Sequence, residues 1–145
     1  MKNDFEIVIV EDNPNDAELM LRSLKKNRLA NNVIILEDGE QALDFIFCRG
    51  KYTGRDVSAP PKVMFLDLKL PKVGGLEVLK QMKSNEKTRK IPVIVVTSSK
   101  EDPDIVTAYD LGVNSYVVKP INFDSFFEKM GQIGFYWLAV NEKPI

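Results

Sequence analysis

The sequence contains no histidine and only one cysteine among its 145 residues. The lack of histidine excludes an imidazole as general acid or base, as phosphoryl donor or as metal ligand. Because Cys48 has no second cysteine to pair with, the chain cannot form an internal disulfide. This cysteine usage is typical of proteins from a reducing compartment.

The chain also lacks a charge excess and a long apolar run. It carries 20 basic and 21 acidic residues, a net charge of −1, so its overall charge favours neither nucleic acid nor an anionic membrane. The apolar stretch at residues 6–10 is too short for a signal peptide or a membrane span. We therefore expect a cytoplasmic protein with no direct nucleic-acid or membrane partner. The length suits one domain, residues 1–145, with no separate output domain.

Five short apolar runs, mostly of β-branched residues, alternate with amphipathic stretches; they lie at residues 6–10, 32–36, 62–66, 92–96 and 115–119. Continuous apolarity indicates strands buried on both faces, as in a parallel sheet covered by helices. Each intervening segment has helical spacing, and a last helix is expected to begin near Phe123 and run towards Trp137. The longest segment without such a pattern, residues 49–61, is expected to form an exposed loop before the third strand. The alternation predicts a flavodoxin-like (βα)5 fold, a doubly wound parallel α/β sheet with strand order 2-1-3-4-5.

Polar side chains stand where the predicted strands end. The first strand ends in Glu11 and Asp12, the third in Asp67, the fourth in Thr97 and the fifth in Lys119. In open α/β sheets, ligands bind outside the carboxyl ends of the strands. The order 2-1-3-4-5 makes the first and third strands neighbours, so we expect the three carboxylates to converge.

Three close carboxylates repel one another, and at least one stays protonated unless a cation intervenes. Ligands that are all oxygen atoms favour Mg²⁺, which keeps waters that a phosphate can displace. With a lysine and a hydroxyl added, the set contains a carboxylate nucleophile, a metal, an ammonium and a hydrogen-bond donor. These groups are what phosphoryl transfer onto an aspartate needs.

Four motifs in order and spacing resemble the receiver domains of two-component response regulators. They are "VEDN" at 10–13, "FLDLKLPKVGG" at 65–75, "VVTSS" at 95–99 and "YVVKP" at 116–120. The resemblance covers essentially the whole chain. It implies that Asp67 accepts a phosphoryl group from a partner histidine kinase. It also implies that the chain catalyses its own phosphorylation and dephosphorylation, with no separate substrate turnover.

The resemblance further assigns roles to the other strand-end residues. Glu11, Asp12 and Asp67 would hold Mg²⁺, with the backbone carbonyl of Lys69 completing the protein ligands. The side chain of Lys69 departs from the family pattern, which often has another polar residue there, and an extra cation could change the phosphate lifetime.

The phosphoryl group itself would be bound by Thr97 and Lys119. Tyr116 would be the switch residue that reorients as Thr97 moves, and Lys119 would be joined to Pro120 by a cis peptide bond. Because Tyr116 lies in a predicted strand, a role in packing comes first and a role in switching second.

A narrower resemblance is visible towards the C-terminus. "AYDLGVNSYVVKP" at 108–120 and "FYWLAVNEKP" at 135–144 resemble stand-alone receivers, which include the partners of bacterial phytochromes. Such receivers often form homodimers through the fourth helix, the fifth strand and the fifth helix. The resemblance thus implies a sensor kinase, a phytochrome among others, as the partner.

Other functions fit the sequence less well. A flavodoxin-like FMN carrier needs neutral groups after the first strand, but residues 11–16 read "EDNPND", with three acids. A Mg²⁺-dependent phosphatase with an aspartyl nucleophile usually has a second acid two residues later, where this chain has Lys69. A degenerate receiver that signals by protein contact alone stays open. Structural roles stay open too, since Glu11 and Asp12 also favour the N-terminus of the following helix.

Overall fold

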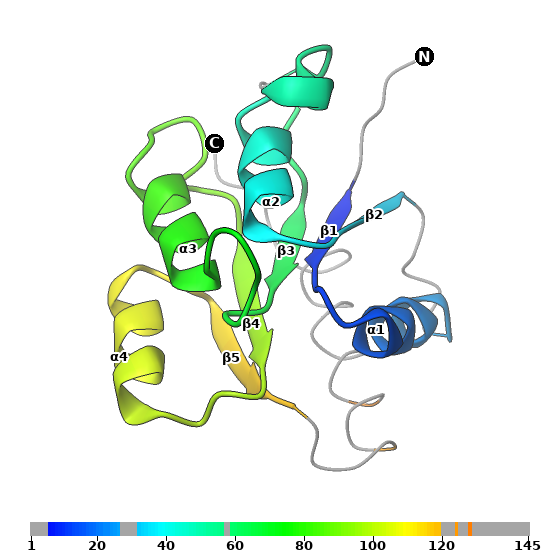
Figure 1. Cartoon of the computed structure of the whole chain (residues 1–145), viewed down its shortest axis with the longest axis vertical. Helices are drawn as coiled ribbons and strands as arrows, with labels where there is room; N and C mark the ends of the chain where they lie inside the picture. The colour runs from blue at the N-terminus through cyan, green and yellow to red at the C-terminus, as the bar shows by residue number, and fades with distance from the viewer. Residues whose placement is uncertain (1–5, 27–31, 57–58, 120–123, 125–127, 129–145) are drawn as a thin grey trace.

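The computed structural model describes residues 6–26, 32–56, 59–119, 124 and 128. Its centre is a five-stranded sheet in the order β2-β1-β3-β4-β5, in which every neighbouring pair is parallel (Figure 1). The order confirms the predicted topology. The strands are β1 Ile7–Val10, β2 Val33–Leu36, β3 Val63–Leu66, β4 Val93–Thr97 and β5 Ser115–Val118.

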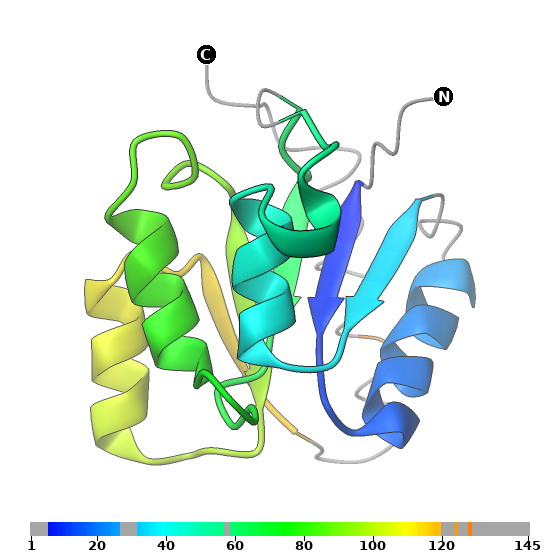
Figure 2. The ribbon, with the colours of Figure 1, turned by 45° about the horizontal axis from the view of Figure 1, so that its top comes forward.

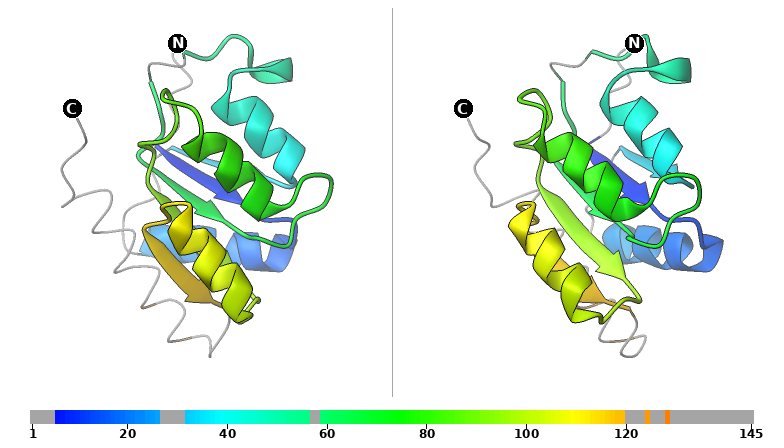
Figure 3. Two further views of the ribbon diagram at one scale, coloured as in Figure 1. Left: turned by 90° about the vertical axis from the view of Figure 1, so that its left-hand side faces the viewer. Right: turned by 60° about the vertical axis from the view of Figure 1, so that its left-hand side comes forward.

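The helices cover both faces of this sheet. Side chains from α2, α3 and α4 share one core cluster, whereas Met20 and Leu24 of α1 belong to the other, and Figures 2 and 3 show α1 apart from the other three helices. The helix predicted from Phe123 lies outside the described residues. The helices are α1 Pro14–Lys26, α2 Gly39–Ile46, α3 Gly75–Lys83 and α4 Asp102–Asp110, with a short 3₁₀ helix η1 at Gly50–Tyr52.

The central strands are buried on both faces, as their continuous apolar runs predicted. Successive residues of β1 alternate between the two cores, with Val8 and Val10 in one and Ile7 and Ile9 in the other, and all four are fully buried. At the edge strand β2, by contrast, Ile35 is 36% exposed. The polar residues that follow β1 and β3 therefore project from a fully buried apolar layer.

Local capping fixes where α1 begins. The Asn13 side-chain oxygen accepts hydrogen bonds from the backbone N–H groups of Asn15 and Asp16, at 2.9 and 3.1 Å. Pro14 follows at the first helical position, where its missing N–H removes no helical bond. The acids that end β1 are thus followed at once by a helix, and the first turn of that helix lies beside them.

The loop expectation for residues 49–61 is wrong in part. Residues 50–52 form η1, and the Tyr52 ring meets the Phe45 ring edge-on with centroids 5.2 Å apart. The Arg55 guanidinium lies 3.7 Å from the centroid of the Phe45 ring and donates to the Phe45 carbonyl. Contacts of Tyr52 and Arg55 with Phe45 of α2, rather than any local pattern, thus fix residues 50–55.

Two glycines allow the loop after β3 to close tightly. A Cβ atom on Gly75, the first residue of α3, would lie 2.2 Å from the Asp67 carbonyl oxygen. A Cβ atom on Gly39 would lie 1.8 Å from the Val73 carbonyl oxygen, and the Gly39 N–H donates to Pro71 at 3.3 Å. Helices α2 and α3 therefore both start against the loop that follows Asp67, and they hold it at the carboxyl edge of the sheet.

Candidate functional site

The predicted carboxylates meet at the carboxyl edge of the sheet. Val10 pairs with Leu66, so the residues that follow β1 and β3 lie side by side. Glu11, Asp12 and Asp67 each offer an oxygen atom within 4.8 Å of the others. Glu11 and Asp67 are 1% and 4% exposed, whereas Asp12 is open to solvent. The predicted convergence of the three acids is confirmed.

Lys119, which directly follows β5, forms ion pairs with Glu11 and Asp67 and with a further acid, Asp16. Its ammonium nitrogen lies 2.6 Å from Glu11 Oε1, 3.0 Å from Asp67 Oδ2 and 2.8 Å from Asp16 Oδ2. An ammonium has three N–H donors, and three carboxylates accept them here. With 7% of its side chain exposed, Lys119 is a buried cation, held by the buried Glu11 and Asp67 and by the half-buried Asp16.

Burial and charge move the pKa of Glu11 and of Asp67 in opposite directions. Burial raises the pKa of Glu11 to about 7, and the negative charge of Asp67 adds to this, while Lys119 opposes it. At Asp67 burial also acts to raise the pKa, but hydrogen bonds from Thr97, the Lys69 N–H and Lys119 outweigh it and hold the pKa below its ordinary value. Asp67 is therefore an ionised carboxylate at neutral pH, as a nucleophile requires.

The pKa of Lys119 is raised. Burial acts to lower it, but the hydrogen bonds to Asp16, Glu11 and Asp67 outweigh burial and keep the side chain charged. One ammonium faces several carboxylates, so the site keeps an excess of negative charge. That excess favours a further cation.

The donor set fits a hard divalent cation. Every candidate ligand in the group is a carboxylate oxygen, which is the ligand type that Mg²⁺ and Mn²⁺ prefer. Burial is the main cause of the raised pKa of Glu11, and the negative charge of Asp67 adds to it in spite of Lys119. Glu11, Asp12 and Asp67 could hold such a cation. For Lys69 the structure places the backbone N–H 3.1 Å from Asp67 Oδ1, and the role of its carbonyl stays a prediction.

Thr97 and Tyr116 are linked through the loop that follows β4. Thr97 is fully buried at the end of β4, where its side chain hydrogen-bonds Asp67. The Tyr116 hydroxyl donates to the Ser99 carbonyl at 3.0 Å, and the Ser99 N–H donates to Thr97 Oγ1 at 3.4 Å. A chain of contacts thus joins Asp67 to the half-buried ring of Tyr116. The predicted cis bond before Pro120 lies outside the described residues.

Asp16 was missed by the sequence reasoning. A usable signal was present, because α1 begins two residues after Asp12 and helical side chains lean towards the N-terminus of their helix. An acid in the first turn of α1 therefore points back at the end of β1. The spacing alone did not show that the ammonium from β5 would reach it.

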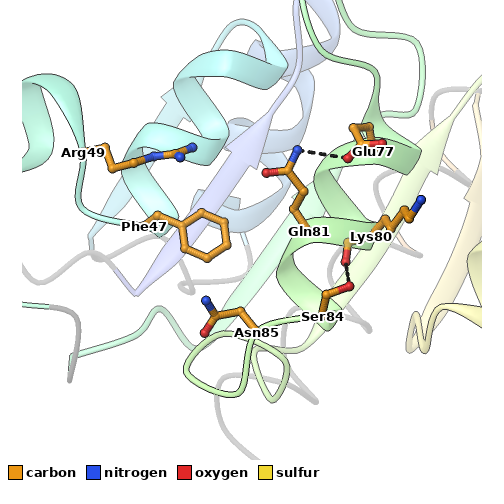
Figure 4. Close-up of a pocket in the computed structure, with 7 residues that line it drawn as sticks. All are labelled: Phe47, Arg49, Glu77, Lys80, Gln81, Ser84 and Asn85. Carbon is orange, nitrogen blue, oxygen red and sulfur yellow. Dashed lines mark hydrogen bonds between the residues drawn. The ribbon is translucent and has the colours of Figure 1, made fainter.

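A separate shallow pocket lies between α2 and α3, with a volume of about 400 Å³ (Figure 4). Phe47 and Arg49, just after α2, form one side, and Lys80 and Gln81 of α3 form the other. It shares no residue with the acidic group. Separately, no helix in the described part of the chain is long and apolar enough to cross a membrane.

Known proteins resemble this chain over almost its whole length. Residues 7–130 match the family described as the response regulator receiver domain. A probable methanogenesis regulatory protein, FilR2 of Methanothrix harundinacea, is 40% identical over 140 residues, which cover 97% of this chain and 88% of FilR2.

Two similar structures agree with this match. The Mn²⁺-bound form of response regulator Rcp1, a protein of Synechocystis, is 35% identical with a TM-score of 0.87, covering 96% of this chain and 98% of that one. The phosphorylated cyanobacterial phytochrome response regulator RcpA is 32% identical, also with a TM-score of 0.87, covering 97% and 99%. The chain therefore belongs to the response regulator receiver domain family, whose members take part in two-component signalling.

Proposed function

We propose that this protein is a stand-alone response regulator, with residues 1–145 acting as one receiver domain. Asp67 accepts a phosphoryl group from a histidine kinase in a Mg²⁺-dependent reaction. The observation that carries the proposal is the buried, ionised Asp67, held by Thr97 and Lys119 beside two further carboxylates. The match to response regulator Rcp1 over 98% of that chain supports the stand-alone regulator, and the Mn²⁺-bound form of Rcp1 supports the need for a divalent cation.

The reaction is a direct transfer. An Asp67 oxygen attacks the phosphorus of a phosphohistidine, the O–P bond forms, and the P–N bond breaks with its electron pair left on the imidazole nitrogen. Mg²⁺, held by Glu11, Asp12 and Asp67, would neutralise charge on the phosphoryl oxygens. Lys119 and the hydroxyl of Thr97 bind those oxygens in the product, and hydrolysis of the acyl phosphate later returns the free carboxylate.

The switch follows from the contacts of Thr97. When Thr97 turns to bind the phosphoryl group, its contact with the Ser99 N–H changes. The carbonyl of the same Ser99 accepts the hydrogen bond from the Tyr116 hydroxyl, so this second contact changes too. The phosphoryl group then favours one of two arrangements of this loop and ring. The surface formed by α4 and β5 changes with it.

That surface has the features of a protein contact. On α4, Val106 and Tyr109 are 57% and 51% exposed, and β5 is at the edge of the described sheet. Homodimerisation through α4, β5 and the segment after Lys119 is part of the proposal. The kinase we propose is a phytochrome-type or other sensor kinase of the cytoplasm, which the similarity to RcpA supports.

Phosphorylation by a small acyl phosphate tests the function without the kinase. The intact protein is incubated with acetyl phosphate in Mg²⁺ or in EDTA, and its mass is measured. We expect one phosphoryl adduct in Mg²⁺ and none in EDTA, because excess negative charge opposes an anionic donor when no cation is bound. No adduct under either condition would overturn the proposal and leave signalling by protein contact alone.

A further inference from the structure

Asp16 shares the ammonium of Lys119 but stands apart from the acids that could hold a cation. Its Oδ2 lies 2.8 Å from Lys119 Nζ, a distance between those of Glu11 and Asp67. Its side chain is 34% exposed, whereas those of Glu11 and Asp67 are 0% and 6% exposed. The group of candidate metal ligands contains Glu11, Asp12 and Asp67 and does not include Asp16.

The donors of Lys119 are all occupied before phosphorylation. Each of the three N–H groups has a carboxylate partner, so the ammonium can bind a phosphoryl oxygen only by giving up or sharing one of these bonds. Glu11 and Asp67 serve the reaction as metal ligand and nucleophile. Asp16 has no hydrogen-bond donor to offer the phosphoryl group, and it adds one negative charge to a site that must bind an anion. It also occupies one N–H donor of Lys119, the cation that the phosphoryl group needs.

We propose that Asp16 is a positioning residue that competes with the phosphoryl group for Lys119 and thereby limits how readily Asp67 is phosphorylated. The inference rests on the proposed function. In the unphosphorylated protein, Asp16 keeps Lys119 drawn towards α1. Phosphorylation must weaken that ion pair, so the charge of Asp16 raises the free energy of the phosphorylated state relative to the free one.

A role in helix stability does not account for the contact. An acid in the first turn of α1 interacts favourably with the partial positive charge at the N-terminus of the helix, and this interaction does not require contact with Lys119. Glu18, on the same helix, gives a matched comparison. It is an acid that pairs with Arg22 on the surface at 3.0 Å, with 54% of its side chain exposed.

The experiment uses Asp16→Asn, which keeps the size and an oxygen acceptor but removes the charge. The initial rate of adduct formation from acetyl phosphate in Mg²⁺ is expected to rise roughly threefold to tenfold, the effect of one nearby charge in a partly solvated site. Asp16→Glu should return the rate towards wild type. Glu18→Gln should leave it unchanged, and about 1 M salt should shrink the effect of Asp16→Asn by screening.

An equilibrium readout separates this role from a structural one. The apparent dissociation constant of beryllofluoride, a phosphoryl mimic, is expected to fall by a similar factor in Asp16→Asn, with Mg²⁺ present. Unfolding curves of the same variants report whether the helix is intact.

The outcomes distinguish this inference from the proposed function. A wild-type adduct with a faster Asp16→Asn variant, unchanged Glu18→Gln and tighter beryllofluoride binding supports the inference. A wild-type adduct with an Asp16→Asn rate equal to or below the wild-type rate overturns it and leaves the proposed function standing. A folded wild type that forms no adduct overturns both.

Discussion

An Asp67→Asn variant is expected to form no phosphoryl adduct with acetyl phosphate and Mg²⁺, under conditions in which the wild type forms one. The amide has nearly the size of the carboxylate but is no nucleophile for phosphorus. The fold should persist, because the amide keeps the shape of the side chain, and Glu11 and Asp16 still accept hydrogen bonds from Lys119. Intact mass and an unfolding curve of the same sample check both statements.

The matched control for this variant is Asp110→Asn. Asp110 is an exposed acid at the end of α4, just before β5 begins, so it lies towards the amino edge of the sheet and away from the site at the carboxyl edge. This variant should be phosphorylated as the wild type is. Persistence of the adduct in folded Asp67→Asn would mean that another side chain is the acceptor.

Gly75→Ala is expected to destabilise the protein by about 1–3 kcal/mol, the usual range for forcing extra atoms into a packed site. The added Cβ would lie 2.2 Å from the Asp67 carbonyl oxygen and 2.6 Å from Leu68 Cα, and both are backbone atoms that cannot swing aside. Helix propensity alone predicts the opposite sign, because alanine is the better helix former. Denaturant unfolding therefore tests the packing of α3 against Asp67 through both the sign and the size of the change in the free energy of unfolding.

Gly54→Ala is the control for added bulk at a glycine. A Cβ atom there would meet nothing within 4 Å, so we expect no loss, or a gain below about 1 kcal/mol from the stiffer unfolded chain. Because Gly75 lies against the backbone of Asp67, the proposed acceptor, Gly75→Ala should also slow phosphorylation. Equal stability of Gly75→Ala and wild type would contradict the close approach of α3 to the loop after Asp67.

The sheet and the meeting of the acids could be predicted because they depend on patterns within the sequence. Alternate residues of β1 lie in opposite cores, and its burial on both faces follows from the unbroken run of apolar residues in its sequence. Once β1 and β3 are neighbours, the pairing of Val10 with Leu66 brings Glu11 and Asp67 together. The rule that ligands bind outside the carboxyl ends of parallel strands then locates the site from the strand order alone.

The contacts made across the fold could not be predicted in the same way. Asp16 and Lys119 are 103 residues apart in sequence, and their 2.8 Å contact depends on the direction in which the first turn of α1 faces. The partner of the Tyr116 hydroxyl is a backbone carbonyl, which no side-chain pattern marks. The η1 turn is likewise held by contacts of Tyr52 and Arg55 with the Phe45 ring, which the local sequence pattern does not show.

The central claim is that Asp67 is the phosphoryl acceptor, and localising the adduct tests it most directly. The protein is phosphorylated with acetyl phosphate and Mg²⁺ and treated with borohydride, which reduces an aspartyl phosphate to homoserine. Its peptides are then sequenced by mass spectrometry. We predict homoserine at position 67 and at no other acid. Reduction products at Glu11, Asp12 or Asp16 in place of Asp67 would contradict the assignment.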